Sequence, residues 1–254
     1  MPSTIAVQLY TLREFTKTPA DIAATLKRVK KMGYDAVQIS ALGPIEPREL
    51  AAILQGEGLF CCASHLPFEK IRDETQQVID NHRLWKCPYL AIGGYGFSKM
   101  DEQKWSTFIA DYAELNRKFT GSGVRLGYHN HNHEFLKFGG KTVLQRMYDE
   151  WDASIHFILD TYWIQYAGAD PADWIRRARG RAPCVHFKDM APTPERQIKM
   201  AEVGEGNLNW SAIIEACGSA GTQWHIVEQD NCNGKDPFEC VELSLRNMRE
   251  MGLA

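Results

Sequence analysis

Eight short apolar segments alternate with eight amphipathic stretches along nearly the whole chain. Each apolar segment has the length and composition of a buried strand. The stretches between them repeat apolar residues at helical spacing, as in the stretch that opens at Thr18-Pro19 and ends at Gly33. Strict alternation implies parallel strands joined by right-handed helical crossovers. The predicted strands are residues 5–9, 35–39, 59–63, 89–92, 124–128, 155–159, 182–187 and 223–227.

The number of repeats favours a closed barrel over an open sheet. The chain has 254 residues, and a (β/α)8 barrel typically needs about 250. An open nucleotide-binding sheet usually has a glycine-rich loop after its first strand, whereas residues 10–14 contain no glycine. We find no linker or low-complexity segment. The sequence therefore predicts one α/β domain, a (β/α)8 TIM barrel over residues 1–254.

Composition limits the partners and the compartment that we expect. With 29 basic and 32 acidic residues the net charge is −3, which gives no electrostatic case for binding nucleic acid or an anionic membrane. Seven cysteines without C-x-x-C spacing indicate free thiols in a reducing compartment, and no run of 18 apolar residues occurs. We expect a cytoplasmic protein with a small-molecule partner. A homo-oligomer is compatible with the sequence.

Four apolar segments end on side chains that can bind a metal ion: Glu134, Asp160, His186 and Glu228. The separations are 26 (134 to 160), 26 (160 to 186) and 42 (186 to 228) residues, and the first two match one strand plus one helix. In barrels the active site lies at the carboxyl ends of the strands. We therefore expect the four groups to converge.

Three carboxylates and one imidazole favour one divalent cation with a preference for oxygen. Mn2+ is the first choice on this set, with Mg2+, Zn2+, Co2+ or Ni2+ as alternatives. The alternative interpretation is structural. Asp160 would cap the following turn, Glu134 would be a solvated loop carboxylate, and His186 and Glu228 would form an ion pair.

Further polar groups near strand ends are candidate site residues. Among the histidines of residues 129–133 we select His131 for proton transfer, and we expect His129 and His133 to be structural. Lys188 follows His186 and is a catalytic candidate, with an exposed ion pair as the alternative. His65, Gln8 and Trp163 are the candidate substrate-binding residues.

Several phrases resemble the sugar phosphate isomerase/epimerase family of the xylose isomerase-like TIM barrel superfamily. The phrases are VQLYTLR at 7–13, YHN at 128–130 with His131, EF at 134–135, LDTYW at 159–163, HFKDM at 186–190, VGEG at 203–206 and VEQD at 227–230. The resemblance implies the same fold and a metal held by Glu134, Asp160, His186 and Glu228. Relatives of this kind include ketose 3-epimerases and dehydratases.

The sequence departs from that family pattern at the first metal ligand. In ketose epimerases this ligand is a glutamate within strand five, where this chain has Tyr128-His129-Asn130. Either Glu134 reaches back to the metal or His131 substitutes. A DNA-repair endonuclease of the superfamily has a histidine where this chain has Trp163, which argues against DNA chemistry.

The expected reaction is proton abstraction beside a carbonyl of a keto-sugar or keto-inositol, as an isomerase or epimerase. Glu134 and Glu228 would serve as base and acid, with His131 and Lys188 assisting. A lyase or dehydratase acting on a 3-keto-sugar or keto-inositol is the alternative. A barrel that binds sugar without turning it over is the alternative of another class.

Overall fold

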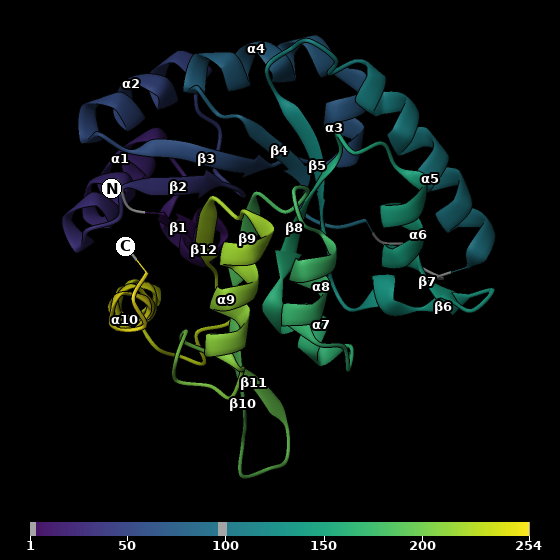
Figure 1. Ribbon diagram of the computed structural model, residues 1–254. Helices are drawn as coiled ribbons and strands as arrows, with labels where there is room; N and C mark the ends of the chain where they lie inside the picture. Colours follow the sequence, from purple (N-terminus) through teal and green to yellow (C-terminus); the bar gives the residue numbers. More distant parts are fainter. Residues whose placement is uncertain (1–3, 96–100, 254) are drawn as a thin grey trace.

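Eight parallel strands close into a barrel in the computed structural model, which describes residues 4–95 and 101–253. The order around the barrel is β1-β12-β9-β8-β5-β4-β3-β2 (Figure 1). This confirms the predicted (β/α)8 fold. The barrel strands are β1 Ile5–Gln8, β2 Ala36–Ile39, β3 Phe60–His65, β4 Tyr89–Ile92, β5 Arg125–His129, β8 His156–Asp160, β9 Cys184–Phe187 and β12 Trp224–Val227.

Helices surround the barrel on its outer side (Figure 1). The first long helix shows why they form where they do, because Thr18 and Asp21 make a reciprocal capping box and Gly33 ends the helix at φ 104°. The helices are η1 Leu9–Phe15, α1 Pro19–Met32, α2 Pro47–Glu57, α3 Phe68–Asp73, α4 Thr75–Trp85, α5 Glu102–Arg117, η2 His133–Phe135, α6 Val143–Glu150, α7 Thr161–Tyr166, α8 Pro171–Arg177, α9 Trp210–Ala220 and α10 Pro237–Glu250.

Local structure departs from a simple alternation of one strand and one helix at four places. Two helices, α3 and α4, lie between β3 and β4, because Glu74 at φ −116° interrupts the helical path. Two helices, α7 and α8, also lie between β8 and β9, and α7 starts directly after β8. The connection between β9 and α9 contains a hairpin of β10 Asp189–Pro192 and β11 Ile198–Ala201. A second small hairpin pairs β6 Lys137–Phe138 with β7 Lys141–Thr142.

The barrel interior has an apolar layer below a polar layer. Small and apolar side chains, including Ala6, Ala36, Ile158, Cys184 and Ile226, form one buried cluster. Two residues further along the same strands, on the same face of each strand, come the polar residues of the site. These residues are Gln8, Gln38, Asp160, His186 and Glu228. The alternation of side chains along each strand therefore delivers the polar groups to the carboxyl end.

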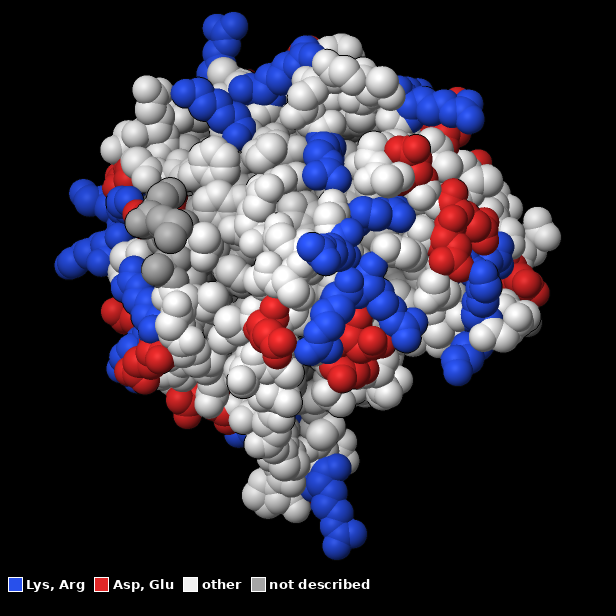
Figure 2. All heavy atoms as spheres, in the orientation of Figure 1, with Lys and Arg blue, Asp and Glu red and all other residues white. Residues whose placement is uncertain are grey.

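The β10–β11 hairpin projects away from the barrel (Figure 1). Basic and acidic side chains are interspersed over the face shown in Figure 2, and Lys or Arg side chains lie at the tip of the projection. Across the described residues, none of the helices has both the length and the apolar character required to cross a membrane.

Candidate metal centre and adjoining cavity

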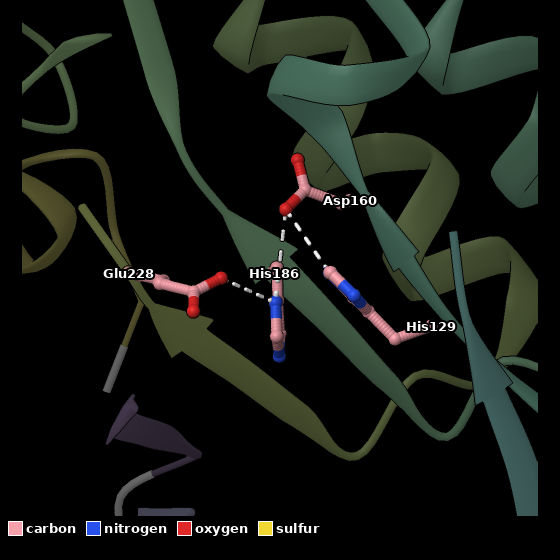
Figure 3. A group of neighbouring side chains, drawn as sticks. All are labelled: His129, Asp160, His186 and Glu228. Atoms are coloured by element: carbon pink, nitrogen blue, oxygen red, sulfur yellow. Dashed lines mark hydrogen bonds and ion pairs between the residues drawn. The ribbon is translucent and has the colours of Figure 1, made fainter. Parts of the chain in front are cut away.

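Four buried side chains from four strand ends point toward one another: His129, Asp160, His186 and Glu228 (Figure 3). Their candidate ligand atoms all lie within 4.8 Å of one another. The barrel register produces this arrangement, since Asp160 is paired directly with His186. Of the four ligands predicted from the sequence, the structure brings Asp160, His186 and Glu228 together.

Asp160 uses its two carboxylate oxygens differently. Oδ1 accepts the backbone N–H of Trp163 at 2.9 Å and so caps α7. Oδ2 faces the cluster, 3.2 Å from His129 Nε2 and 3.7 Å from His186 Nδ1. The capping role and the ligand role that the sequence presented as alternatives are thus compatible in one side chain.

Each imidazole of the cluster has one nitrogen held by an amide carbonyl and the other aimed at carboxylates. His186 Nε2 lies 2.7 Å from Gln38 Oε1, and His129 Nδ1 lies 3.4 Å from the carbonyl oxygen of Gly93. Because these carbonyl oxygens can only accept, they assign the N–H to the outward nitrogens. His186 Nδ1 then faces Glu228 Oε2 at 2.8 Å, a separation at which a proton, or a metal ion that replaces it, lies between the two atoms. Metal-binding histidines are oriented in the same way.

Lys188 places a buried ammonium among three carboxylates. Its Nζ lies 3.3 Å from Asp160 Oδ2, 3.1 Å from Glu228 Oε2 and 2.9 Å from Asp230 Oδ2. Burial alone would raise the pKa of Asp160 and Glu228, but Lys188 together with His129 and His186 outweighs this effect and holds both pKa values well below their usual range. The two carboxyl groups of the cluster are therefore ionised.

The pKa of His186 is shifted upward, in contrast to the lowered pKa values of Asp160 and Glu228. Burial lowers its pKa, but the carboxylates of Glu228 and Asp160 outweigh burial and raise the pKa to about 9. A site that raises the pKa of a buried histidine this far attracts cations, and a bound metal would have to replace that proton.

The cluster fits a divalent cation in charge and in spacing. Together with the adjoining Lys188 and Asp230, the site has three carboxylates and one ammonium, which leave two negative charges when the carboxylates are ionised and the imidazoles are neutral, and a divalent ion would balance them. Two ligands on opposite sides of one such ion are at most about 4.2 Å apart, twice a bond of about 2.1 Å. The contacts of Asp160 with the two imidazoles and of His186 with Glu228, from 2.8 to 3.7 Å, lie within that limit, and the bound for the whole cluster is 4.8 Å.

Glu134 is not part of this cluster. Its carboxylate is fully buried and accepts hydrogen bonds from the hydroxyl of Tyr128 and from the backbone N–H of His131 at 2.8 Å. His133 Nε2 lies 3.0 Å from Glu134 Oε1. Strand geometry ends at His129, and η2 turns Glu134 toward Tyr128 instead of the barrel axis. Glu134 also belongs to a second group, with His131 and His133, whose spacing is compatible with a metal ion.

A cavity of about 220 Å³ adjoins the cluster. His131, Lys188 and Glu228, three of the four predicted catalytic residues, line it together with His65, His129 and Asp230. Burial is the main cause that lowers the pKa of His131 to about 4, followed by its neighbour His129. His131 is therefore neutral near pH 7, and its Nδ1 is buried without a protein partner.

Of the three predicted substrate-binding residues, only His65 is among the residues that line this cavity. His65 lines it, and its Nε2 is buried without a protein partner. Gln8 lies behind His65, with its Nε2 3.4 Å from His65 Nδ1. Trp163 packs its ring against His131, with centroids 5.2 Å apart, and its Nε1 is also buried without a protein partner.

Sequence reasoning missed three residues of the site: His129, Gln38 and Asp230. His129 was expected to be structural, yet it lies in the cluster. Gln38 lies in β2, one residue before its end, and orients His186. Asp230 pairs with Lys188 from two residues beyond Glu228. Their positions near strand ends marked these residues as candidates, but position alone could not decide which of several neighbouring polar residues points into the site.

Asp189, which follows Lys188, points away from the cavity. Its carboxylate accepts the backbone N–H groups of Gly204 and Gly206 at 3.0 and 3.1 Å and the indole N–H of Trp210 at 2.7 Å. The Gly204-Glu205-Gly206 segment is thus a turn tied to β10. Of the pair Lys188 and Asp189, Lys188 is the one that faces the cavity.

Solved structures share this fold at low sequence identity. A sugar phosphate isomerase/epimerase from Parabacteroides distasonis is 19% identical over 98% of this chain and 94% of its own, with a TM-score of 0.81. An L-ribulose 3-epimerase is 18% identical over 99% and 94%, with a TM-score of 0.75. A probable 3-DHS dehydratase from Bacillus anthracis is 14% identical over 97% and 98%, with a TM-score of 0.72.

Identities this low establish the fold but not the reaction. Among proteins of curated function, none matches this sequence significantly. The family comparison is more direct, because residues 26–251 match the family described as xylose isomerase-like TIM barrel. This match spans most of the barrel, and the chain therefore belongs to the xylose isomerase-like TIM barrel family.

Proposed function

We propose that this chain is a divalent-metal-dependent isomerase or epimerase of a keto-sugar or keto-inositol, acting by proton abstraction next to a carbonyl. The observation that carries the proposal is the position of the cavity, which is lined by His129 and Glu228 of the cluster and by His131 and Lys188. The solved relatives described as epimerases support the same reaction class. A bound divalent ion would supply positive charge to stabilise an enediolate.

Glu228 and His131 are the acid–base pair in this proposal. Both line the cavity, and they come from the ends of β12 and β5, which β9 and β8 separate in the barrel. Two groups that reach the cavity from separated strands can serve different faces or carbons of one substrate. Glu228 is ionised and His131 is neutral, so either can accept a proton near pH 7. Glu134 is not retained as the base, because it is buried against Tyr128.

The cavity favours a hydroxyl-rich substrate without a phosphate group. Lys188 already contacts three carboxylates, and Arg13 donates to the backbone carbonyls of Tyr10 and Asp230 at 2.8 and 3.0 Å. Ring nitrogens of His65 and His131, which both line the cavity, are in contrast buried without protein partners. Such groups suit sugar hydroxyls, which both donate and accept hydrogen bonds.

A lyase or dehydratase is the second candidate, and the position of Lys188 favours it. The Lys188 ammonium lines the cavity, where its positive charge could stabilise a departing hydroxyl or glycosyl oxygen that takes its proton from the group that removed the C–H proton. The same base begins both reactions, so only the fate of the intermediate separates them.

Deuterium exchange tests the proposal directly. The metal-loaded protein is incubated in D2O with ketoses, keto-inositols and 3-keto-glycosides, and C–H exchange is followed by NMR. We expect metal-dependent exchange that falls by about 10² to 10⁴ in Glu228→Gln. The exchanged carbon and the products then separate epimerase, isomerase and lyase.

The matched control is Glu215→Gln, which alters an exposed carboxylate on α9 and should leave exchange unchanged. A protein that holds about one metal ion per chain and binds a panel sugar without any exchange would refute the proposal. That outcome would favour a sugar-binding barrel.

A further inference from the structure

We propose that His129 is a metal ligand and that it shifts the ion preference of this site from Mn2+ and Mg2+ toward Zn2+, Co2+ and Ni2+. The inference rests on the metal site of the proposed function but not on its reaction. Three carboxylates and one imidazole, the set expected from the sequence, favour Mn2+. The clustered set has two imidazoles and two carboxylates, and imidazole nitrogen prefers the later transition metals.

His129 is held in the orientation that a ligand needs. It is the last residue of β5, the residue is 3% exposed, and its Nδ1 lies 3.4 Å from the carbonyl oxygen of Gly93. With the Nδ1 hydrogen directed at that carbonyl, Nε2 faces Asp160 Oδ2 at 3.2 Å. Two such acceptor atoms are held together by a proton or by a metal ion between them, and this is the position that a metal ion would take.

His186 repeats this arrangement on the neighbouring side of Asp160. Gln38 holds its outer nitrogen, and its inner nitrogen, Nδ1, is buried without a hydrogen bond close to Glu228 and Asp160. Two imidazoles oriented by amide carbonyls, with both inner nitrogens on one carboxylate, form a two-nitrogen, two-oxygen cation site. The carbonyl oxygens of Gly93 and of the Gln38 side chain orient both rings before any ion binds.

The glutamate that would restore a three-carboxylate set cannot replace His129. Both oxygens of Glu134 are engaged, by the Tyr128 hydroxyl and His133 on one side and by the His131 backbone N–H on the other. Releasing this buried carboxylate would leave the Tyr128 hydroxyl without its acceptor, at a cost of about 1 to 3 kcal/mol. His129 is thus the group at the end of β5 that completes the cluster.

The test measures metal selectivity without any substrate. Almost every site binds Zn2+ more tightly than Mn2+, so the informative quantity is the ratio of the two affinities in wild type and in His129→Glu. Chelator-treated protein is titrated with each ion in competition with a chromophoric chelator. We expect the Zn2+/Mn2+ ratio to fall at least about tenfold in His129→Glu, because a carboxylate replaces a nitrogen ligand.

His129→Gln retains similar bulk without a good metal donor. It should lower Zn2+ affinity by more than about 100-fold, since losing even an orienting partner of a ligand costs about 10- to 100-fold. His65→Ala is the matched control, because His65 lies beside His129, with ring centroids 5.0 Å apart, but outside the cluster. It should keep the wild-type Zn2+ affinity. The visible spectrum of the Co2+ protein should change in both His129 variants and not in His65→Ala.

Unchanged Zn2+ affinity in His129→Gln, with an unchanged Co2+ spectrum, would overturn the inference. So would an unchanged Zn2+/Mn2+ ratio in His129→Glu. Thermal unfolding of each metal-free variant confirms that the protein tested is folded. These outcomes are independent of the proposed reaction, because a protein that shows the predicted selectivity but no C–H exchange would contradict only the proposed function.

Discussion

Replacement of Glu134 by glutamine should weaken the fold while leaving the metal centre in place. The carboxylate is fully buried and accepts from the Tyr128 hydroxyl, the His131 backbone N–H and His133. Hydrogen bonds to a charged group contribute about 1.5 to 3 kcal/mol each. In Glu134→Gln the charge is lost and an amide NH2 faces at least one of these donors. We expect the free energy of unfolding to fall by about 3 kcal/mol, equivalent to one or two such bonds.

The assay is urea unfolding of chelator-treated protein, with Zn2+ affinity measured in parallel. For a slope near 3 kcal/mol per molar urea, a loss of 3 kcal/mol lowers the midpoint by about 1 M. Glu150→Gln is the control, because Glu150 pairs with Arg146 at 2.9 Å on the exposed surface of α6. An exposed pair of this kind contributes at most about 1 kcal/mol.

The effect of Glu134→Gln should also depend on pH. Burial raises the pKa of Glu134, but the hydrogen bond and charge of His133 outweigh burial and lower the pKa below its usual value. A depressed pKa contributes stability that is present above the unfolded value of about 4.3 and is lost as pH falls through the folded value. The stability gap between wild type and variant should therefore narrow in acid. If the variant kept wild-type stability but lost Zn2+ affinity by more than about 100-fold, Glu134 would be a metal ligand and this reasoning would be refuted.

Two further predictions concern stability. Burial lowers the pKa of His133, but the carboxylate of Glu134 outweighs burial and raises it. Protonated His133 therefore stabilises the fold below the unfolded pKa of about 6.5, and this stabilisation is lost as pH rises through the pKa of the folded protein. The stability advantage of wild type over His133→Gln should shrink between pH 6 and pH 9, and a constant advantage in urea unfolding would contradict it. Gly127→Ala should cost at least about 1 to 3 kcal/mol, because its Cβ would lie 2.3 Å from His156 Cε1. In Gly56→Ala on α2, the new Cβ would have no neighbouring heavy atom within 4 Å. This substitution should instead raise the free energy of unfolding by about 0.5 to 1 kcal/mol. Equal melting temperatures for the two alanine variants would show that the His156 ring moves aside freely.

Local patterns in the sequence were sufficient for the barrel and for three of the four side chains of the buried cluster. Short apolar runs, capped helices and their strict alternation depend on interactions within a few residues, so they can be recognised without coordinates. Asp160, His186 and Glu228 converge because the carboxyl ends of parallel strands lie on one side of the barrel.

The remaining member of the cluster could not be chosen from the sequence. Between His129 and Glu134 several ionisable side chains lie within a few residues, and which one reaches the barrel axis depends on where strand geometry ends. The bonds that set this path join distant segments, such as His133 Nε2 with the backbone oxygen of Tyr95 at 3.0 Å.

Sequence by itself thus determined the barrel and the strand ends that meet in it, because both follow from periodicity and chain connectivity. Only the tertiary structure decided that His129 enters the cluster while Glu134 turns toward Tyr128. It also decided that Lys188 lies buried among Asp160, Glu228 and Asp230. The physical reason is that a buried charge is stable only where the surrounding fold supplies its partners: the partners of Lys188 come from other segments, and those of Glu134 are brought to it by the turn that follows β5.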